Sequence, residues 1–295
     1  MKSGRICVLG HVTRDIVRGP GDAERTQPGG TAYYAAAALA CLGFPVHLVT
    51  RMARRDHVLL DGLKGLGVSV AARDSVETTA FETVYRENPD RPGREPLAVA
   101  DPFDESDFEG VAARAVVMDP LATHDGFTAL MSAAARAAPL VALDLQGWVR
   151  KFLIPGVSET TRAEQLAGLI HVSVLKADIE EAAKLTYETN PARAAAALAG
   201  LGAREVIVTM GGEGSHVLAE GRGYDIPAYP PQALVDPTGA GDSYLAGYVA
   251  ARLEGMNPAE AGRFGAALAS LKLARHGPFA GTWEDVLALL TGMTG

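Results

Sequence analysis

The sequence predicts an α/β fold in which helices cover both faces of a mostly parallel sheet. Short apolar runs such as Arg5–Gly10 alternate with amphipathic or alanine-rich stretches such as Thr31–Leu42. Strands that are apolar along their whole length are typical of parallel sheets buried on both sides. After Tyr229 the alternation stops, and the remaining residues predict helices with little strand between them. We therefore expect one α/β domain over residues 1–295 with a helical C-terminal part.

Each apolar run is predicted to be a strand and each periodic stretch a helix. The predicted strands are Arg5–Gly10, Pro45–Arg51, Ala115–Asp119, Leu140–Asp144, His171–Leu175 and Glu205–Thr209. The predicted helices are Thr31–Leu42, Arg55–Leu66, Gly126–Ala137, Thr160–Leu169, Ile179–Thr186, Pro191–Leu201, Gly239–Glu254, Pro258–Ala274 and Trp283–Leu290.

One segment, Arg73–Phe108, departs from this alternation. Residues Thr79–Tyr85 alternate between apolar and polar, and an apolar run follows at Pro96–Ala100. This pattern predicts a hairpin with one apolar and one polar face. Such an insertion serves as a lid, as a dimer surface or as a decorated edge of the main sheet, and we favour the lid. Its exposed edge would allow a homodimer.

The charge balance disfavours large anionic partners. Lys and Arg number 27 against 35 Asp and Glu, which gives a net charge of −8 and argues against nucleic acid or an anionic membrane. The two cysteines, Cys7 and Cys41, lie in apolar runs and form neither a disulfide framework nor a zinc ligand set, so we expect a cytoplasmic protein. The uncharged stretch Thr26–Thr50 is alanine-rich and interrupted by Gly43 and Pro45, which favours a helix and a strand over a membrane span.

The strongest local feature is a glycine turn before an apolar helix, with the sequence Asp236-Pro237-Thr238-Gly239-Ala240-Gly241-Asp242-Ser243. Such a turn directs several unpaired N–H groups to one place, where the helix dipole favours an anion. Asp242 beside that anion site fits a general base for an attacking hydroxyl. The alternative is an ordinary glycine turn in which Asp242 caps the helix.

The whole stretch resembles the C-terminal motif of the ribokinase-like (phosphofructokinase B, PfkB) carbohydrate kinases. Gly10 with Asp15 resembles the first strand of that family and its sugar-binding aspartate, and Gly29-Gly30 resembles its N-terminal glycine motif. The segment Thr209–Gly214 resembles the nucleotide-site turn Thr-x-Gly-x-x-Gly. The resemblance covers nearly the whole chain. It implies a three-layer α/β/α fold with a small β lid from about residues 11–27 and 73–108.

The resemblance also implies a function, namely ATP-dependent phosphorylation of a hydroxyl on a small sugar or cyclitol. Asp242 would be the base, and the amides of Gly239, Ala240 and Gly241 would form the anion hole. Asp15, Gly29 and Gly30 would bind the acceptor. The ATP site would be lined by Thr209, Gly211, Gly214, Thr238 and Gly277. Asp236, with Thr238, would be the candidate for a monovalent cation such as K⁺.

Asp178 stands where the family usually has the Asn of an Asn-x-x-Glu motif, whereas Glu181 keeps its place. A pair of carboxylates can still order the water molecules of Mg²⁺, because hard cations prefer oxygen ligands. Asp178 also precedes a helical pattern, which is typical of an N-cap residue, and both roles are compatible.

The acceptor-binding residues differ from those of ribose kinases. Tyr34 stands where many members have an Asn, and Gln146 and Arg150 lie in a loop after a buried strand, at the sheet edge where ligands bind. This loop and the Gly-Gly-Thr-x-Tyr-Tyr sequence most resemble the myo-inositol kinase branch, so a cyclitol is the first choice and a nucleoside the runner-up. Tyr34 as a core residue and Arg150 as a solvated arginine remain equal alternatives.

Two other functions are consistent with an α/β fold. A nucleotide-binding oxidoreductase would carry Gly-x-Gly-x-x-Gly after the first strand, where this chain reads Gly10-His11-Val12-Thr13-Arg14-Asp15. A Walker A loop is excluded because no lysine follows a glycine. A sensor that has lost catalysis is the remaining alternative, and the intact turn with Asp242 speaks against it.

Overall fold

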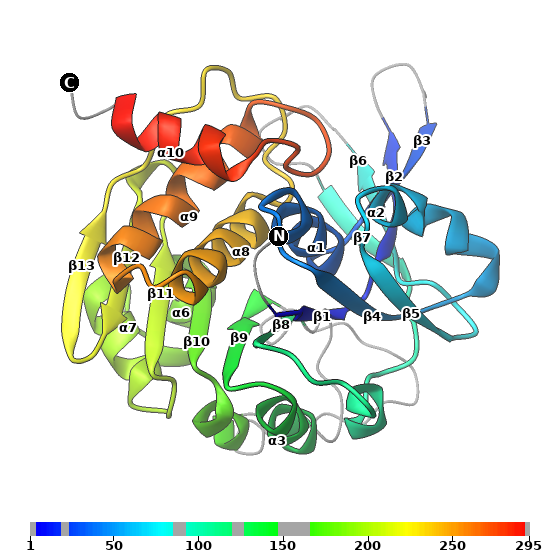
Figure 1. Ribbon diagram of the computed structural model, residues 1–295, viewed down its shortest axis with the longest axis horizontal. Coiled ribbons are helices and arrows are strands. Elements are labelled where there is room, and N and C mark those ends of the chain that lie inside the picture. The colour runs from blue at the N-terminus through cyan, green and yellow to red at the C-terminus, as the bar shows by residue number, and fades with distance from the viewer. Residues whose placement is uncertain (1–3, 19–23, 85–92, 120–126, 147–165, 293–295) are drawn as a thin grey trace.

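The computed structural model describes residues 4–18, 24–84, 93–119, 127–146 and 166–292 (Figure 1). The strands are β1 Ile6–Gly10, β2 Thr13–Arg18, β3 Glu24–Gly29, β4 Val46–Met52, β5 Ser69–Asp74, β6 Ala80–Val84, β7 Gly93–Ala98, β8 Ala115–Asp119, β9 Leu140–Asp144, β10 Val174–Asp178, β11 Glu205–Thr209, β12 Ser215–Ala219 and β13 Arg222–Ile226. The α-helices are α1 Thr31–Cys41, α2 Asp61–Gly65, α3 Phe127–Ala137, α6 Ile179–Thr186, α7 Pro191–Ala199, α8 Ala240–Leu253, α9 Pro258–Leu273 and α10 Trp283–Gly292. Short 3-10 helices are η1 Arg54–Leu60, η2 Glu105–Phe108, η3 Gly168–His171 and η4 Gly211–Glu213.

The main sheet has nine strands in the order β13-β12-β11-β10-β9-β8-β1-β4-β5. The seven strands from β11 to β5 pair in parallel, and β12 and β13 extend the sheet antiparallel at one end. Helices α1, α8 and α9 lie side by side over one face (Figure 1). The predicted α/β class with a mostly parallel sheet is confirmed.

Each central strand contributes to two hydrophobic cores. In β1, Ile6 and Val8 join the core under α1, α8 and α9, whereas Cys7 and Leu9 join the core under α3, α6 and α7. Successive side chains of a strand point to opposite faces, so a strand buried on both sides must be apolar throughout. This is why the apolar runs identify these strands in the sequence.

Three strands of the main sheet were not predicted from the sequence, and one was predicted at shifted bounds. The strands that were not predicted are β5, β12 and β13. β5 and β13 lie at the sheet edges and carry exposed polar side chains, whereas β12 is mostly buried but begins with the polar residues Ser215 and His216. The strand predicted at His171–Leu175 runs instead over Val174–Asp178, and a 3-10 helix occupies 168–171. The helix predicted at Arg55–Leu66 is a 3-10 segment followed by the short α2. Most of the helix predicted at Thr160–Leu169 lies outside the described residues.

A second, smaller sheet has the order β3-β2-β6-β7 and lies at one side of the main sheet (Figure 1). The hairpin predicted around residues 79–100 is β6 paired antiparallel with β7. Residues 73–74, placed in the lid by the sequence, belong to β5 of the main sheet. β3 and β7 are the edges of the smaller sheet, so a homodimer through it stays a prediction.

Across the described ranges, none of the helices has the length and apolarity needed to cross a bilayer.

Candidate active site

The glycine turn lies where α8 begins. Gly239 is the N-cap residue in the left-handed region, with φ 79° and ψ 9°, and as a glycine it has no side chain to cap the first turn of α8. The Ala240 amide donates to the Pro237 carbonyl at 3.3 Å, and the dipole of the 14-residue helix favours an anion at this end. Asp242 lies in that first turn and is only 9% exposed. The structure thus brings together the four residues assigned to phosphoryl transfer.

Helix α8 is held firmly against the sheet. The Tyr248 hydroxyl donates to Glu205 Oε2 at 2.6 Å, and Arg252 forms an ion pair with the same carboxylate at 2.6 Å. Gly247 lets α8 approach α9, because a Cβ there would lie 3.1 Å from the Cα of Gly265. These contacts fix the axis of α8 and thereby the position of the glycine turn.

Tyr34 lies directly behind the glycine turn. Its ring is 1% exposed, and a Cβ built on Gly239 would overlap its Cγ and Cδ1 atoms. Tyr34 is four residues from Gly30, about 6 Å along α1, so this helix links the Gly-Gly motif to the glycine turn. The ring therefore packs against the glycine turn, and its expected contact with the acceptor stays a prediction.

A buried lysine lies beneath the turn. Lys176 Nζ donates to Asp144 Oδ2 at 2.7 Å, and a Cβ on Gly241 would lie 2.8 Å from the same nitrogen. Burial disfavours the charged form of Lys176, but the carboxylates of Asp144, Glu181 and Asp242 outweigh it and raise its pKa. Lys176 thus forms an ion pair with Asp144 and also interacts with the charges of Glu181 and Asp242.

Asp178 and Glu181 form a reciprocal capping box at the start of α6. Asp178 Oδ1 accepts from the Glu181 amide at 2.7 Å, and Glu181 Oε2 accepts from the Asp178 amide at 2.8 Å. Each carboxylate has a second oxygen that takes no part in the box. Burial, followed by the charge of Asp144, raises the pKa of Glu181 to about 7. This excess of negative charge suits a hydrated Mg²⁺, which would be held by Asp178 and Glu181 through water.

No group of three or more His, Cys, Asp or Glu side chains within the described ranges is arranged to bind a metal ion directly.

We expect Glu181→Gln to stabilise the metal-free protein at alkaline pH. The folded pKa of about 7 lies above the ordinary value of 4.5, so the contribution of Glu181 to stability is full below pH 4.5 and is lost as the pH rises through 7. Gln keeps the capping bond and carries no charge. In EDTA, the melting temperature of the variant should exceed that of the wild type by on the order of 3 °C at pH 8 and by almost nothing at pH 4.

The matched control is Glu180→Gln, because Glu180 is an exposed carboxylate in the same first turn of α6. Glu180→Gln should not raise the melting temperature in a pH-dependent way. An equal rise in melting temperature for the two variants at pH 8 would contradict the inference that the ionised Glu181 carboxylate destabilises the fold. Added Mg²⁺ should stabilise the wild type more than Glu181→Gln.

The carboxylate of Asp236 organises the segment before the turn. Oδ1 accepts from the Thr238 amide at 2.9 Å, and Oδ2 accepts from the Gly277 amide at 3.4 Å. Burial alone would raise the pKa of Asp236, but these bonds and the charge of Lys272 outweigh it and hold the pKa below its ordinary value. The predicted nucleotide-site residues Thr238 and Gly277 are thus joined through Asp236.

Lys272 donates to the carbonyl oxygen of Asp236 at 2.7 Å, and its Nζ lies 3.4 Å from Asp236 Oδ2. Burial lowers the pKa of Lys272, and the carboxylates of Asp236 and Asp242 offset part of that effect. A K⁺ ion on these oxygens would face the ammonium at contact distance, so the residues present do not fit the expected monovalent cation.

The second predicted nucleotide motif follows β11. Thr209 ends that strand, and its hydroxyl donates to the Ala177 carbonyl at 3.4 Å. Gly211 and Gly214 have φ of 57° and 98°, and a Cβ on Gly214 would overlap the Ile226 carbonyl. The backbone therefore requires glycine at Gly214. Gly211 begins η4 and Gly214 follows it, at the carboxyl end of a parallel strand, where α/β sheets bind ligands.

The predicted acceptor residues gather at the start of α1. Asp15 is 3% exposed, accepts from the Thr13 hydroxyl at 2.7 Å, and would be overlapped by a Cβ on Gly29. The Thr31 hydroxyl donates to Gln146 Oε1 at 3.5 Å, which brings the loop after β9 to the Gly29-Gly30 pair. Arg150, also predicted here, lies outside the described residues.

Lys176 and Lys272 were missed by the sequence prediction, although a signal for each exists. Lys176 interrupts an otherwise apolar strand, and Lys272 follows Phe264 and Leu268 at helical spacing on the buried stripe of α9. A lysine on a buried face requires an anionic partner, so each position points to a carboxylate elsewhere in the fold.

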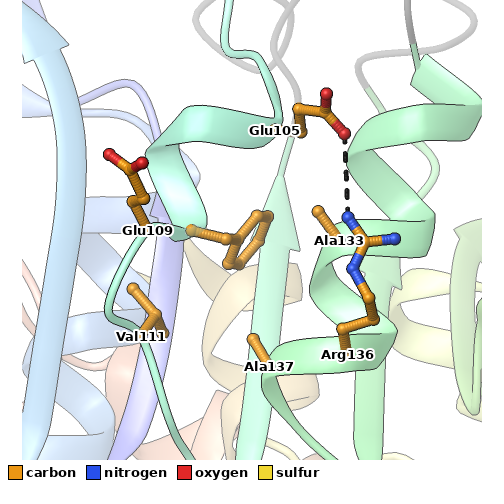
Figure 2. A pocket seen from close by; sticks show the side chains of 7 residues that line it. Glu105, Glu109, Val111, Ala133, Arg136 and Ala137 are labelled. Carbon is orange, nitrogen blue, oxygen red and sulfur yellow. Dashed lines mark ion pairs between the residues drawn. The ribbon is translucent and has the colours of Figure 1, made fainter.

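A hollow of about 250 Å³ lies elsewhere, between η2 and α3. Figure 2 shows Glu105 and Arg136 facing each other across it, with a 3.7 Å ion pair between exposed side chains. None of the candidate site residues lines this hollow.

Comparison with known proteins identifies the family of this chain. The profile of the "pfkB family carbohydrate kinase" matches residues 4–285. The chain belongs to the pfkB family of carbohydrate kinases. It is thus a phosphotransferase of a family in which ATP is the usual donor and an alcohol group the acceptor.

Individual relatives differ in substrate. The cytidine kinase of Thermococcus kodakarensis is 26% identical over 267 residues, 88% of this chain and 92% of its own. The nucleoside kinase of Methanocaldococcus jannaschii is 37% identical over 87 residues, 29% of either chain. A solved pyrophosphate-dependent kinase of the ribokinase family, bound to a pyrophosphate analog and myo-inositol, is 26% identical with a TM-score of 0.83, and the alignment covers 96% of this chain and 99% of that one.

Proposed function

We propose that this kinase transfers the γ-phosphoryl group of ATP to a hydroxyl of a small cyclitol or sugar, with myo-inositol as the first candidate. The observation that carries the proposal is the uncapped glycine turn at α8 with the buried Asp242 in its first turn. An anion hole beside a carboxylate fits phosphoryl transfer to a hydroxyl, in which charge builds on the transferring group while the attacking oxygen loses a proton.

In the proposed mechanism, Asp15 binds the acceptor near Gly29, and Asp242 takes the proton of the attacking hydroxyl. The amides of Gly239, Ala240 and Gly241 hold the phosphoryl oxygens, and Lys176 offsets the charge beneath them. The new bond joins the acceptor oxygen to the γ-phosphorus, the bond to the bridging oxygen breaks, and ADP leaves. Mg²⁺ held by Asp178 and Glu181 would neutralise charge on the donor phosphates.

The smaller sheet would act as the lid of this site. It carries Asp15 on β2, and β3 ends at Gly29, so its position bears directly on the acceptor. Closure of such an element excludes water and limits futile hydrolysis of ATP.

Pyrophosphate is a second candidate donor. The solved kinase bound to myo-inositol uses it, and so does a second pyrophosphate-dependent structure that is 27% identical with a TM-score of 0.84. The buried ammonium groups of Lys176 and Lys272 both interact with Asp242, so they bring positive charge to the place where a compact donor without a nucleoside would bind.

The experiment is a matrix of donors and acceptors with Mg²⁺ present. ATP and pyrophosphate are each incubated with myo-inositol, other cyclitols, ribose and cytidine, and phosphate-ester products are detected by ³¹P NMR. We expect one cyclitol or sugar to accelerate donor consumption well above hydrolysis by water. Phosphorylation of cytidine alone would establish the nucleoside alternative. Binding of ATP without turnover on any acceptor would favour the sensor.

A further inference from the structure

The segment before the glycine turn contacts a charged group of α9, Lys272, that no step of the proposed mechanism uses. The side chain of Lys272 is 0% exposed, although a lysine is almost never fully buried unless its charge is paired. It extends from the last turn of α9 to Asp236, three residues before Gly239. The position of this cation therefore needs an explanation.

Each side of the ammonium group faces an electron-rich partner. Nζ donates to the Asp236 carbonyl at 2.7 Å, lies 3.4 Å from Asp236 Oδ2, and lies 5.7 Å from the centroid of the Tyr34 ring. The last distance is within the range of a cation–π contact. A carbonyl, a carboxylate and a π face together make a site for a compact monovalent cation.

This site is joined directly to the anion hole. Asp236 Oδ1 accepts from the Thr238 amide, next to Gly239, and the Tyr34 ring packs against Gly239 itself. The charge of Asp242 also acts on Lys272. A positive charge at Nζ thus stabilises the positions of two groups that contact the turn, namely the Asp236 backbone and the Tyr34 ring.

We propose that the Lys272 ammonium is the built-in monovalent cation of the glycine turn, so that this kinase works without K⁺. The proposal rests on the proposed function of the turn as the site of the donor phosphates. It replaces the expected cation at Asp236 with a group supplied by the chain. Ammonium and K⁺ are similar in size, and a covalently attached ammonium is present at any salt composition.

The test compares two substitutions that differ only in the space they leave. Lys272→Ala removes the charge and leaves room for an ion, whereas Lys272→Met removes the charge and fills the space. Turnover and the melting temperature are measured at constant ionic strength with K⁺, NH₄⁺ or tetramethylammonium as the only monovalent cation. Tetramethylammonium is the reference because it is too large for the site.

We expect wild-type turnover to change less than twofold between the three salts. In tetramethylammonium, the turnover of Lys272→Ala should be at least tenfold below that of the wild type. Addition of K⁺ or NH₄⁺ should restore most of this turnover in a saturable manner. Lys272→Met should stay impaired in every salt. K⁺ should also raise the melting temperature of Lys272→Ala and leave that of the wild type unchanged.

Activation of the wild type by K⁺ of tenfold or more would overturn the proposal, as would full activity of Lys272→Ala in tetramethylammonium. If the variants fail to fold, the dependence of wild-type turnover on K⁺ still tests the proposal. The melting temperatures need no acceptor, so the proposal remains testable if the proposed function itself fails.

Discussion

Asp242→Asn should lower kcat by about 10²–10⁴-fold, because general-base assistance has roughly that value. The amide has the shape of the carboxylate and cannot take the proton of the attacking hydroxyl. Asp242 is buried in the first turn of α8. In the proposed mechanism it takes a proton from the acceptor, so loss of its charge should affect the chemical step more than donor binding. The Kd of a nonhydrolysable ATP analogue should therefore stay within a fewfold of the wild-type value.

The matched control is Glu284→Gln, which makes the same change from carboxylate to amide in the first turn of α10. Its side chain is exposed, so we expect unchanged kinetics and a stability change within about 0.5 kcal/mol. Steady-state kinetics with the best acceptor, together with calorimetry of the ATP analogue, measure both effects. A kcat of Asp242→Asn within tenfold of the wild type would show that another group takes the proton.

The central strands were predictable because burial leaves a clear trace in the sequence. β8, β9 and β11 have the predicted bounds, since each contains an apolar run that is followed by Asp or Thr. Helix α6 also has its predicted bounds, because the capping box of Asp178 and Glu181 marks its first turn. These signals are local and need no knowledge of the rest of the fold.

The hairpin of β12 and β13 was not predicted, because its sequence signals are weak. Its turn at Glu220 and Gly221 has φ of 53° and 73°, and Ala219 pairs with Arg222 across it. Such a two-residue turn favours Asn-Gly or Asp-Gly, and Glu-Gly is a weaker signal. β13 is also mostly exposed, so it lacks the apolar run that identifies a central strand.

The candidate site also has a part that the sequence predicts and a part that it does not. The glycine turn with Asp242 is one short motif, and the Asp178–Glu181 pair is another, so each can be predicted from neighbouring residues. The partners of Lys176 and Lys272 are Asp144 and Asp236, which are 32 and 36 residues away in the chain. Pairs of that kind depend on which strands and helices become neighbours, and a single sequence does not reveal this.

Gly239→Ala should lower kcat/KM by at least about 10²-fold, the cost of one displaced donor in an anion hole. Gly239 has φ of 79°, and an alanine in this region costs about 1–2 kcal/mol. Its Cβ would also overlap the Tyr34 ring, which is buried and contacts Lys272 on another side. Because the ring has no space to move into, the turn itself must shift, and its amides leave the positions that hold the phosphoryl oxygens.

Gly255→Ala separates the overlap from the backbone strain. Gly255 lies just past the other end of α8 with φ of 86°, and a Cβ there would meet nothing within 4 Å. Gly255→Ala should lose a similar amount of stability through backbone strain and keep the kcat/KM of the wild type. Introducing Gly239→Ala into a Tyr34→Ala background should cost less activity than introducing it into the wild type, since the overlapping ring is gone. Equal losses of kcat/KM in the two glycine variants would mean that strain alone, and not the position of the turn amides, explains the effect.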